Sequence, residues 1–443
     1  MKVTRLPVDP GPSGWNEILQ AAGPADVLDD RLTADWLVIG AGFAGLAATR
    51  RLAQLDPSAR IVLLEAGRVG AGPAGRNSGF MIDLPHDLSS DDYGGAVQAD
   101  MAQTRAKRAG IDFAAEMAAE YDLGEEAFAR VGKTNAAATE KGHRHNLDYA
   151  AHLAEMGEPR DMLDAADMRA LTGTEYYRSG VYTPGSAMIQ PAMFVRGVAR
   201  GLRSNRVHVF EGSPVVELVR QGDWVARTPR GAVTAPKVIL AVNGHAESFG
   251  QFRGRLLHVF TYASMTRALS RTESAALGGA PRWGVTPADP MGTTVRRVRG
   301  TGGDRIVVRN RFTCDPSMTV SDRRIARVGR DHDRAFAARF PQLCGVEMAY
   351  RWGGRLCLSW NGVPALGEIE EGLYSACCQN GLGTAKGTLH GKLMAELAAG
   401  HRSALLEAVT GQDAPRRLPP LPFTFAGANA VMRWGEHKAG AEM

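Results

Sequence analysis

Two glycine-rich turns lie close together near the start of the chain, and turns of this composition bind phosphate groups and flat rings. The first reads GAGFAG over residues 40–45, and the second reads GPAGRNSG over residues 72–79. Glycine has no side chain, so a ligand can approach the backbone N–H groups of such a turn closely. The first turn therefore predicts nucleotide binding, whereas the second is either a surface turn or a further contact with the ligand.

The elements around the first turn form a complete βαβ unit. Residues 35–39 (DWLVI) are an apolar run typical of a buried strand, and leucines at helical spacing follow over 46–55. A second apolar strand over 61–64 ends at Glu65. A strand, a helix and a second strand in register with the glycines are the context that a dinucleotide-binding fingerprint requires.

Each glycine of this fingerprint has its own physical reason. Gly40 permits the tight turn after the strand, Gly42 lets the backbone approach a pyrophosphate, and Gly45 allows close packing of the helix on the strand. The positive end of the helix then faces the phosphates. Glu65 stands where a carboxylate accepts the hydroxyls of an adenosine ribose, and its charge argues against NADP. The fingerprint by itself fits both NAD and FAD.

The second turn indicates which of the two cofactors, NAD or FAD, the chain binds. An NAD enzyme of this architecture would run directly into another helix. This chain instead forms a Gly/Pro/Ala loop that carries Arg76 and Asn77, and then continues as an extended segment. The small residues allow backbone N–H groups to approach a planar ring and a diphosphate.

The arrangement GAGFAG…LLEAGRVGAGPAGRNSG resembles the D-amino-acid oxidase (DAO) superfamily of FAD enzymes, closest in motif to its gamma-glutamylputrescine oxidase and glycine oxidase branches. A similar GRN-G loop follows the Glu-ending strand there, and RWGGRLCLSWNGVPALG at 351–367 matches a WGG segment followed by asparagine and proline. The resemblance covers most of the chain and is specific at 35–81, 351–367 and 373–398. It implies that FAD is the cofactor and that the two turns hold its two ends.

By that resemblance, the FAD contacts are spread along the whole chain. The first turn and the end of the second strand hold the ADP half, the second turn lies along the flavin, and a strand near residue 215 pairs with the adenine. A later glycine-rich loop presents a helix N-terminus to the flavin pyrimidine edge, where negative charge accumulates on reduction. The implied positions are Gly40, Gly42, Phe43, Ala44, Gly45, Glu65, Ala66, Ala74, Gly75, Arg76, Asn77, Ser78, Gly79, Val215, Val216, Asn243, Gly244, Gly381, Leu382, Gly383, Thr384 and Lys386.

The resemblance also implies an α/β fold with two interleaved domains. One is a Rossmann-like FAD-binding domain of the glutathione-reductase type, and the other is an α+β substrate domain with a mixed β-sheet and helices. We assign residues 1–85, 185–250 and 351–443 to the FAD-binding domain and residues 86–184 and 251–350 to the substrate-binding domain. Short strands between glycine turns, from VHVFEG to APKVILAVNGH, agree with the first assignment.

Enzymes of this superfamily move a hydride from the carbon beside an amine nitrogen to flavin N5, so we assign no catalytic residue and no metal. The protein must supply a dry pocket and a neutral amine, and burial lowers an amine pKa. The resemblance implies oxidative deamination of a primary or secondary amine or amino acid, imine hydrolysis, and reoxidation by O₂ giving H₂O₂. The alternative is a dehydrogenase that uses a quinone or carrier acceptor. A flavin monooxygenase and a non-catalytic flavoprotein are the remaining alternatives.

Several residues are candidates for the substrate pocket. Phe80 and Met81 follow the flavin loop and would form a wall, while Asp83 and His86 either hold the amine or belong to a capped loop at the domain boundary. Arg355 either binds a substrate carboxylate or lies in solvent. The full set is Phe80, Met81, Asp83, His86, Arg309, Trp352, Arg355 and Asn380.

Three further features concern the hairpin and the flavin. We expect arginines 296, 297, 299, 305, 309 and 311 to form a solvated face, on which alternation singles out Arg309. Cys357 lies a few positions away from the cysteine that carries covalent flavin in the sarcosine oxidase branch, so we expect non-covalent FAD. Lys386 either reaches the flavin or begins a helix.

The composition is that of a globular protein without a nucleic-acid or membrane partner. The chain has 443 residues, 44% of them hydrophobic and 22% charged, with a net charge of +5 that no lysine or arginine run concentrates. Five cysteines at irregular spacing fit neither a disulfide framework nor a zinc site. The first residues lack the apolar core of a signal peptide, and we expect a cytoplasmic protein. The sequence leaves a homo-oligomer open.

Overall fold

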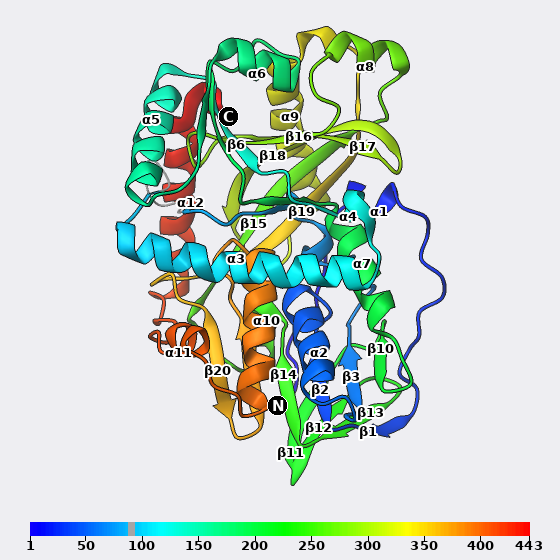
Figure 1. Cartoon of the computed structure of the whole chain (residues 1–443). Coiled ribbons are helices and arrows are strands. Elements are labelled where there is room, and N and C mark those ends of the chain that lie inside the picture. The colour runs from blue at the N-terminus through cyan, green and yellow to red at the C-terminus, as the bar shows by residue number, and fades with distance from the viewer. Residues whose placement is uncertain (87–93) are drawn as a thin grey trace.

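The computed structural model describes residues 1–86 and 94–443, and two large sheets dominate it. Figure 1 shows one sheet in the lower half, behind helices α2 and α10, and the other in the upper half. The long helix α3 (Val97–Glu120) crosses the molecule between the two halves. Helix α10 (Ala385–Ala398) packs against both α2 (Phe43–Leu55) and α3.

The lower half contains the sheet that the βαβ motif predicts. Five parallel strands and one antiparallel edge strand form it in the order β10-β3-β2-β14-β21-β20. Their bounds are β10 (Val207–Phe210), β3 (Ile61–Leu64), β2 (Trp36–Ile39), β14 (Lys237–Leu240), β21 (Leu373–Cys377) and β20 (Ala365–Glu370).

The alternation of side chains along these strands separates two cores. Val38 of β2 packs with Leu46 of α2 and Leu389 of α10 in the helix-side core. Leu37, the preceding residue, packs on the opposite face with Leu218. That face is covered by a four-stranded sheet in the order β1-β13-β12-β11, with the bounds β1 (Arg31–Thr33), β13 (Ala232–Ala235), β12 (Asp223–Arg227) and β11 (Glu217–Gln221). Strands buried on both faces explain why the sequence of this half reads as continuous apolar runs.

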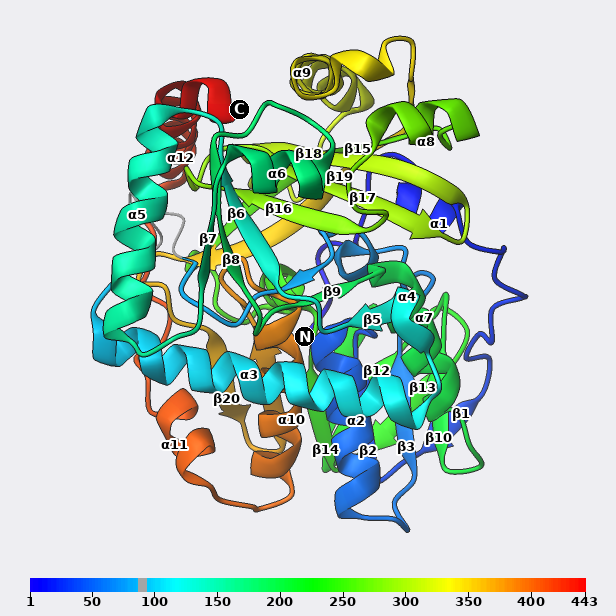
Figure 2. The same ribbon diagram turned by 45° about the horizontal axis from the view of Figure 1, so that its top comes forward.

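The upper half is built on a mixed eight-stranded sheet, which Figure 2 shows from above. Its order is β19-β15-β18-β17-β16-β6-β8-β7, with the β16–β6 pair parallel and the other pairs antiparallel. The bounds are β19 (Met348–Ser359), β15 (Leu256–Thr266), β18 (Gly303–Cys314), β17 (Thr294–Gly300), β16 (Trp283–Pro287), β6 (Lys133–Ala137), β8 (Ser179–Thr183) and β7 (Asp161–Leu163). The predicted hairpin is the β17–β18 pair.

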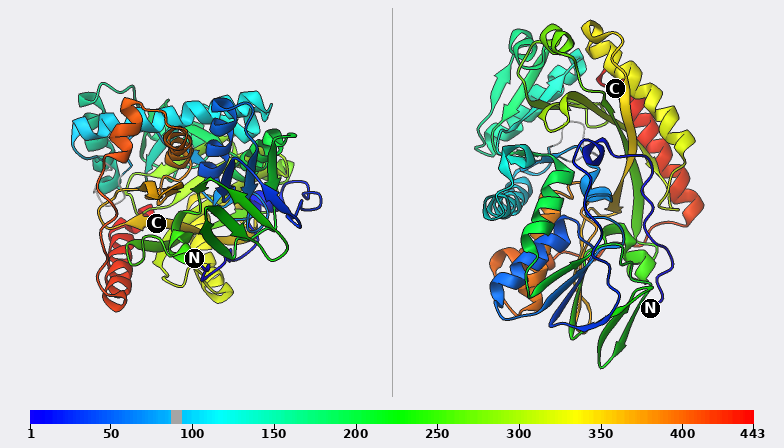
Figure 3. Two further views of the ribbon diagram at one scale, coloured as in Figure 1. Left: turned by 90° about the horizontal axis from the view of Figure 1, so that it is seen from below. Right: turned by 90° about the vertical axis from the view of Figure 1, so that its right-hand side faces the viewer.

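Helices α9 (Asp322–Arg339) and α12 (Leu421–Ala439) both pack on β18 of this sheet, and Figure 3 shows them side by side on its outer face. A small sheet, β4-β9-β5, connects the halves. Its bounds are β4 (Phe80–Met81), β9 (Ala187–Ile189) and β5 (Phe128–Ala129). The other helices are α1 (Gly14–Glu17), α4 (Gly124–Ala127), α5 (Glu140–Glu155), α6 (Ala165–Thr172), α7 (Pro191–Leu202), α8 (Arg271–Leu277) and α11 (Ala404–Thr410), with short 3₁₀ turns η1 (Pro73–Gly75), η2 (Asn243–Phe249), η3 (Pro341–Leu343) and η4 (Gly440–Glu442).

The strands of the eight-stranded sheet come from both segments of the predicted substrate domain. Residues 87–93 of the first segment lie outside the described residues. Strand β19 belongs to the same sheet although the predicted FAD-binding segment begins at 351 within it. The domain bounds stay a prediction.

One expectation about the hairpin is wrong. Arg296 and Arg297 are buried, with 7% and 4% of their surfaces exposed, so they do not belong to a solvated face. Arg297 pairs with Asp304 across the hairpin at 2.6 Å, while Arg296 contacts the backbone of the second glycine turn. Adjacent residues of a strand point to opposite faces of the sheet, so Arg296 and Arg297 lie on different faces. Each is buried because other parts of the structure cover its face. Over the described ranges, no helix has the length and apolarity to span a membrane.

Candidate functional site

One large cavity, of about 1390 Å³, lies between the two halves. Both glycine turns border it, and so do strands of the eight-stranded sheet and helix α12. Its volume exceeds the roughly 300–1,000 Å³ of ordinary small-molecule pockets. The cavity is therefore large enough for an extended ligand and a second small molecule beside it.

The first glycine turn shows why each glycine is needed. A Cβ at Gly45 would lie 1.8 Å from the carbonyl oxygen of Gly40, and Gly40 itself has a φ of +101°. Gly42 differs, because a Cβ there would meet only the Cβ of Ala74, at 3.7 Å. Gly42 is the N-cap residue of α2 and borders the cavity. Its missing side chain thus leaves space for a ligand at the positive end of the helix.

The carboxylate of Glu65 is fixed at the edge of this turn. It accepts hydrogen bonds from the amides of Ala41 at 2.9 Å and Gly67 at 3.0 Å, and it borders the cavity. Burial raises the pKa of Glu65, and the two amides oppose that shift by stabilising the charged form. The oxygens retain lone pairs, so the group can accept further hydrogen bonds from ligand hydroxyls.

The second glycine turn borders the cavity through Gly72, Pro73, Ala74, Asn77 and Ser78. Gly75 and Gly79 stand behind this surface, where a Cβ would lie 1.9 Å from the Gly70 carbonyl oxygen and 1.8 Å from the Arg296 guanidinium, respectively. Gly75 and Gly79 therefore serve the packing of the turn, whereas Gly72 borders the cavity.

Arg76 also serves the turn rather than the cavity. Its guanidinium donates to the carbonyls of Ala71 at 2.6 Å, Pro10 at 2.9 Å and Gly353 at 3.3 Å. Burial lowers its pKa, and the nearby Asp9 carboxylate opposes that effect. Arg76 thereby ties the turn to the N-terminal segment and to β19.

These features fit the ADP-bearing flavin that the sequence implies. The glycine cradle at Gly42, the helix N-terminus, the buried carboxylate of Glu65 and a second turn of small residues border one continuous cavity. A dinucleotide offers a pyrophosphate, ribose hydroxyls and a flat ring to match them.

The remaining implied cofactor positions divide between the cavity wall and its support. Val215, Asn243, Lys386 and the loop 381–384 border the cavity, as do Phe43, Ala44 and Ala66. Val216 is not among the described residues that border the cavity, and its amide donates a hydrogen bond to the carbonyl of Arg227. Gly244 is not among those described residues either, and a Cβ there would lie 2.9 Å from Nδ1 of His258. Thr384 is the N-cap residue of α10, and Lys386 lies in its first turn.

The substrate candidates divide in the same way. Phe80, His86, Arg309, Arg355 and Asn380 border the cavity. The Arg309 guanidinium lies 4.5 Å from the centre of the Phe312 ring, and the Arg355 guanidinium donates to the carbonyl of Met318 at 3.1 Å. Burial lowers the pKa of His86 well below its usual value, and the positive charges of Lys133, Lys107 and Arg309 act in the same direction.

The other three candidates lie behind the wall that the described residues form. Asp83 pairs with Arg108 at 2.9 Å and accepts from the Ser186 hydroxyl at 2.9 Å, and both Met81 and Asp83 have no exposed surface. Trp352 is also completely buried, and its indole N–H donates to the carbonyl of Arg76 at 3.0 Å. Asp83 thus connects its segment to Arg108 of α3 and to Ser186, and Trp352 supports the second turn.

The cavity also contains groups that the sequence reading missed. Lys107 of α3 borders it and donates to the carbonyl of Leu84. Burial, together with the charge of Lys386, lowers the pKa of Lys107 to about 7. A lysine in a long amphipathic helix has no sequence signal that distinguishes it from a solvated one, so only the packing of α3 on α10 reveals it.

The two ends of the chain reach the same cavity. Arg5, Pro7 and Asp9 border it on one side, and Met432 and Trp434 of α12 border it on the other. Burial raises the pKa of Asp9, and the charges of Arg355 and Arg76 oppose that shift. No local sequence pattern in the C-terminal segment indicates a pocket wall.

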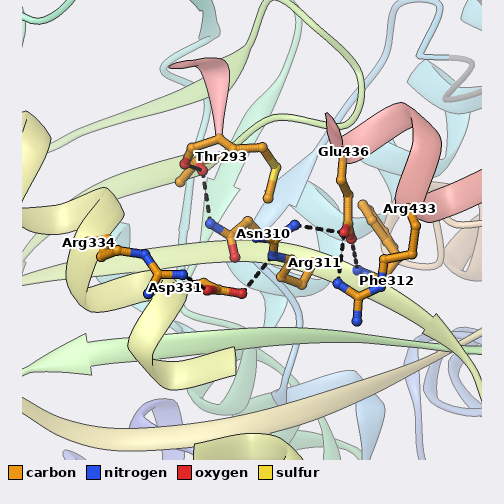
Figure 4. A network of polar contacts seen from close by, with 9 residues as sticks. Thr293, Asn310, Arg311, Phe312, Asp331, Arg334, Arg433 and Glu436 are labelled. Carbon is orange, nitrogen blue, oxygen red and sulfur yellow. Dashed lines mark hydrogen bonds and ion pairs between the residues drawn. The ribbon is translucent and has the colours of Figure 1, made fainter. Parts of the chain in front are cut away.

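Helix α12 holds its part of the wall through a buried carboxylate, which Figure 4 shows. Glu436, with 1% of its side chain exposed, accepts from the Arg311 guanidinium and from the Phe312 amide, both at 2.8 Å. Arg311 has a φ of +62° and is the extra residue of a β-bulge in β18, opposite Thr261 and Tyr262. The bulge lies beside Phe312, which borders the cavity.

Cys357 borders the cavity from β19. A hydrogen bond with the Cys378 thiol, followed by burial, raises the pKa of the Cys357 thiol well above its usual value. The thiolate is the reactive form of cysteine, and this environment disfavours that form at Cys357.

Comparisons with known proteins agree on one family. The model of the DAO family, described as FAD dependent oxidoreductase, matches residues 35–397. Gamma-glutamylputrescine oxidoreductase from Escherichia coli (strain K12) is 26% identical over 416 residues, which cover 90% of this chain and 90% of that protein. Glycine oxidase from Geobacillus kaustophilus has a similar structure, with a TM-score of 0.70, 20% identity, and coverage of 88% of this chain and 100% of that one. L-proline dehydrogenase from P. horikoshii follows with a TM-score of 0.65, 16% identity, and coverage of 85% and 96%. This similarity confirms the predicted fold class.

Proposed function

The chain belongs to the DAO family of FAD-dependent oxidoreductases, and we propose that it oxidises the carbon–nitrogen bond of a small amine or amino acid. The observation that carries the proposal is the single cavity that both glycine turns border together with a second set of titratable groups. The glycine turns account for the cofactor, and Lys107, His86 and Arg309 remain for a small polar substrate. The relative from Escherichia coli, named for an amine derivative, supports the substrate class.

FAD, when bound, supplies the acceptor for a hydride from the substrate carbon. In our proposal the residues of the first turn and Glu65 hold its ADP half, the residues of the second turn lie along the flavin, and those of the loop 381–384 contact the flavin edge. The cradle at Gly42 and the free lone pairs of Glu65 support the first assignment. The raised pKa of the Cys357 thiol, which disfavours the thiolate, supports non-covalent binding.

We propose that Lys107 prepares the substrate by taking up a proton. An amine that enters as ammonium cannot release a hydride until its nitrogen loses the positive charge. With a pKa of about 7, Lys107 is largely neutral in slightly alkaline solution, and its Nζ can accept that proton inside the cavity. The apolar walls at Phe80 and Phe312 exclude water and favour the neutral amine further.

For the electron acceptor we propose O₂, which gives H₂O₂, with hydrolysis of the imine product in water. The same fold serves an oxidase in one related structure and a dehydrogenase in another, so a quinone or carrier acceptor is the second candidate. We also propose a cytoplasmic location, which the five free cysteines of the described chain support.

An absorption spectrum of the purified protein, repeated anaerobically with amines, N-methylated amino acids, and D- and L-amino acids, tests this function. We expect an oxidised-flavin spectrum that one class of compound bleaches. Colour that returns rapidly in air indicates the oxidase, and colour that returns only with a quinone indicates the dehydrogenase. A protein that takes up no added FAD would contradict the proposal.

A further inference from the structure

The carbonyl groups of the last five residues of the second glycine turn are held by side chains from outside the turn. Over five successive residues, 75–79, each carbonyl oxygen accepts a hydrogen bond from a side chain that lies elsewhere in the sequence. The donors are Ser13 to Gly75 at 3.1 Å, Trp352 to Arg76 at 3.0 Å, Trp15 to Asn77 at 2.9 Å, and Arg296 to Ser78 at 3.1 Å and to Gly79 at 2.9 Å. We call Trp15, Trp352 and Arg296 the carbonyl clamp.

The clamp is buried. Both tryptophans are completely buried, and Arg296 is buried between the rings of Trp15 and Phe80, each 5.3 Å from its guanidinium carbon. Arg296 also donates to the carbonyl of Ile189 at 2.8 Å, and within the described residues it has no carboxylate partner. Its positive charge is therefore balanced by hydrogen bonds to backbone carbonyls rather than by an ion pair.

The clamp fixes the direction of two amides. In a planar trans peptide the N–H points away from the C=O of the same peptide unit. Because Trp352 and Trp15 hold the carbonyls of Arg76 and Asn77, the following amides of Asn77 and Ser78 must point the opposite way. Those two amides make no hydrogen bond within the described part of the chain, and both residues border the cavity.

Two adjacent N–H groups that make no hydrogen bond within the described residues and lie at the cavity wall are donors for a centre of negative charge. We propose that the carbonyl clamp is a positioning device that aims the amides of Asn77 and Ser78 at the flavin, where they stabilise its reduced, electron-rich form. This inference rests on the proposed function, because it takes the flavin to lie along the second turn. The clamp residues come from the N-terminal segment, β17 and β19, so they adjust the cofactor from outside the dinucleotide fold.

The test replaces single indole N–H donors and measures the flavin directly, without substrate. Trp15→Phe and Trp352→Phe each keep an aromatic ring and remove one hydrogen bond to the turn. Trp224→Phe is the matched control, since Trp224 is also buried and its indole donates to the carbonyl of Glu371 at 3.1 Å, away from the cavity. The measurements are the midpoint potential in a dye-coupled reductive titration and the dissociation constant of FAD from the apoprotein.

We expect the double variant Trp15→Phe/Trp352→Phe to lose about tenfold in its preference for reduced over oxidised flavin, which is ~30 mV toward negative potential for a two-electron couple. The single variants shift in the same direction by less, and Trp224→Phe keeps the wild-type potential. Arg296→Lys, which keeps the charge, provides the same test should a tryptophan variant fail to fold.

Clamp variants that bind FAD at the wild-type potential would overturn the inference, and so would an equal shift in Trp224→Phe. A wild-type protein that binds no FAD would instead contradict the proposed function. The two failures are therefore distinguishable.

Discussion

Glu436, close to the end of the last helix, accepts a hydrogen bond from the backbone amide of Phe312 at 2.8 Å, although the two residues are 124 positions apart. Phe312 borders the cavity, and the bulge at Arg311 leaves its amide available to the carboxylate. The C-terminal helix, which lies beyond the family match at 35–397, therefore helps to shape the cavity wall.

Removal of this carboxylate should destabilise the protein and disturb the cavity wall. Glu436→Ala leaves the buried Phe312 amide without an acceptor and Arg311 with only Asp331, so we expect a loss of roughly 3 kcal/mol in the free energy of unfolding. Urea denaturation measures it. Arg334→Ala, which breaks the exposed pair with Asp331, should cost at most about 1 kcal/mol. Equal losses in the two variants would show that Glu436 does not hold the bulge.

Two glycines of the first turn should respond differently to alanine. Gly42→Ala adds a methyl group where only the Cβ of Ala74 lies within 4 Å, at 3.7 Å, so the apoprotein should keep its melting temperature. In the proposed site the methyl group occupies the approach of the pyrophosphate, so we expect FAD to bind at least tenfold more weakly. Gly45→Ala places its methyl group 1.8 Å from the Gly40 carbonyl oxygen and should destabilise the apoprotein itself. Calorimetry and FAD titration separate the two effects, and FAD affinity unchanged in Gly42→Ala would argue against a cofactor at this turn.

Lys107 should control the pH dependence of turnover. Burial, followed by the charge of Lys386, lowers its pKa to about 7, so the neutral base becomes available as the pH rises through that value. The rate at low substrate concentration should rise between about pH 6 and 8, and Lys107→Met should lower it by roughly 10²-fold or more and remove this limb. Lys392→Met is a suitable control, because Lys392 pairs with Glu396 on α10 at 3.2 Å, away from the described cavity wall. An unchanged limb in Lys107→Met would assign the proton to another group.

Lys133 should affect stability rather than turnover. Burial lowers its pKa from 10.5 to about 8. Between these two pH values the unfolded chain binds a proton that the folded chain has released, so the free energy of unfolding rises with pH across this window. The full effect is on the order of 3 kcal/mol at most. Lys133→Met, a change of similar volume, should flatten the difference between pH 8 and pH 10 in denaturation curves. Parallel curves for wild type and variant would show that Lys133 is not buried as a neutral amine.

The sequence determines the dinucleotide half of this protein because its signals are local. The spacing of Gly40, Gly42 and Gly45 between two apolar strands predicts the turn and the helix, and the position of Glu65 follows from the length of the same unit. Such a unit forms from residues close in the chain, so its pattern can be recognised without the remainder of the fold. The resemblance added the family and the cofactor, which the match over 35–397 confirms.

Tertiary structure decided which side chains face the cavity. Asp83 and Trp352 are residue types that could contact a substrate, and both lie close in sequence to residues that border the cavity. However, Asp83 pairs with Arg108, and Trp352 supports the second turn. Arg296 and Arg297 are adjacent in an arginine-rich hairpin, but each is buried against partners that come from distant segments. Burial and charge compensation depend on contacts between residues far apart in the chain, and a local pattern contains no record of them.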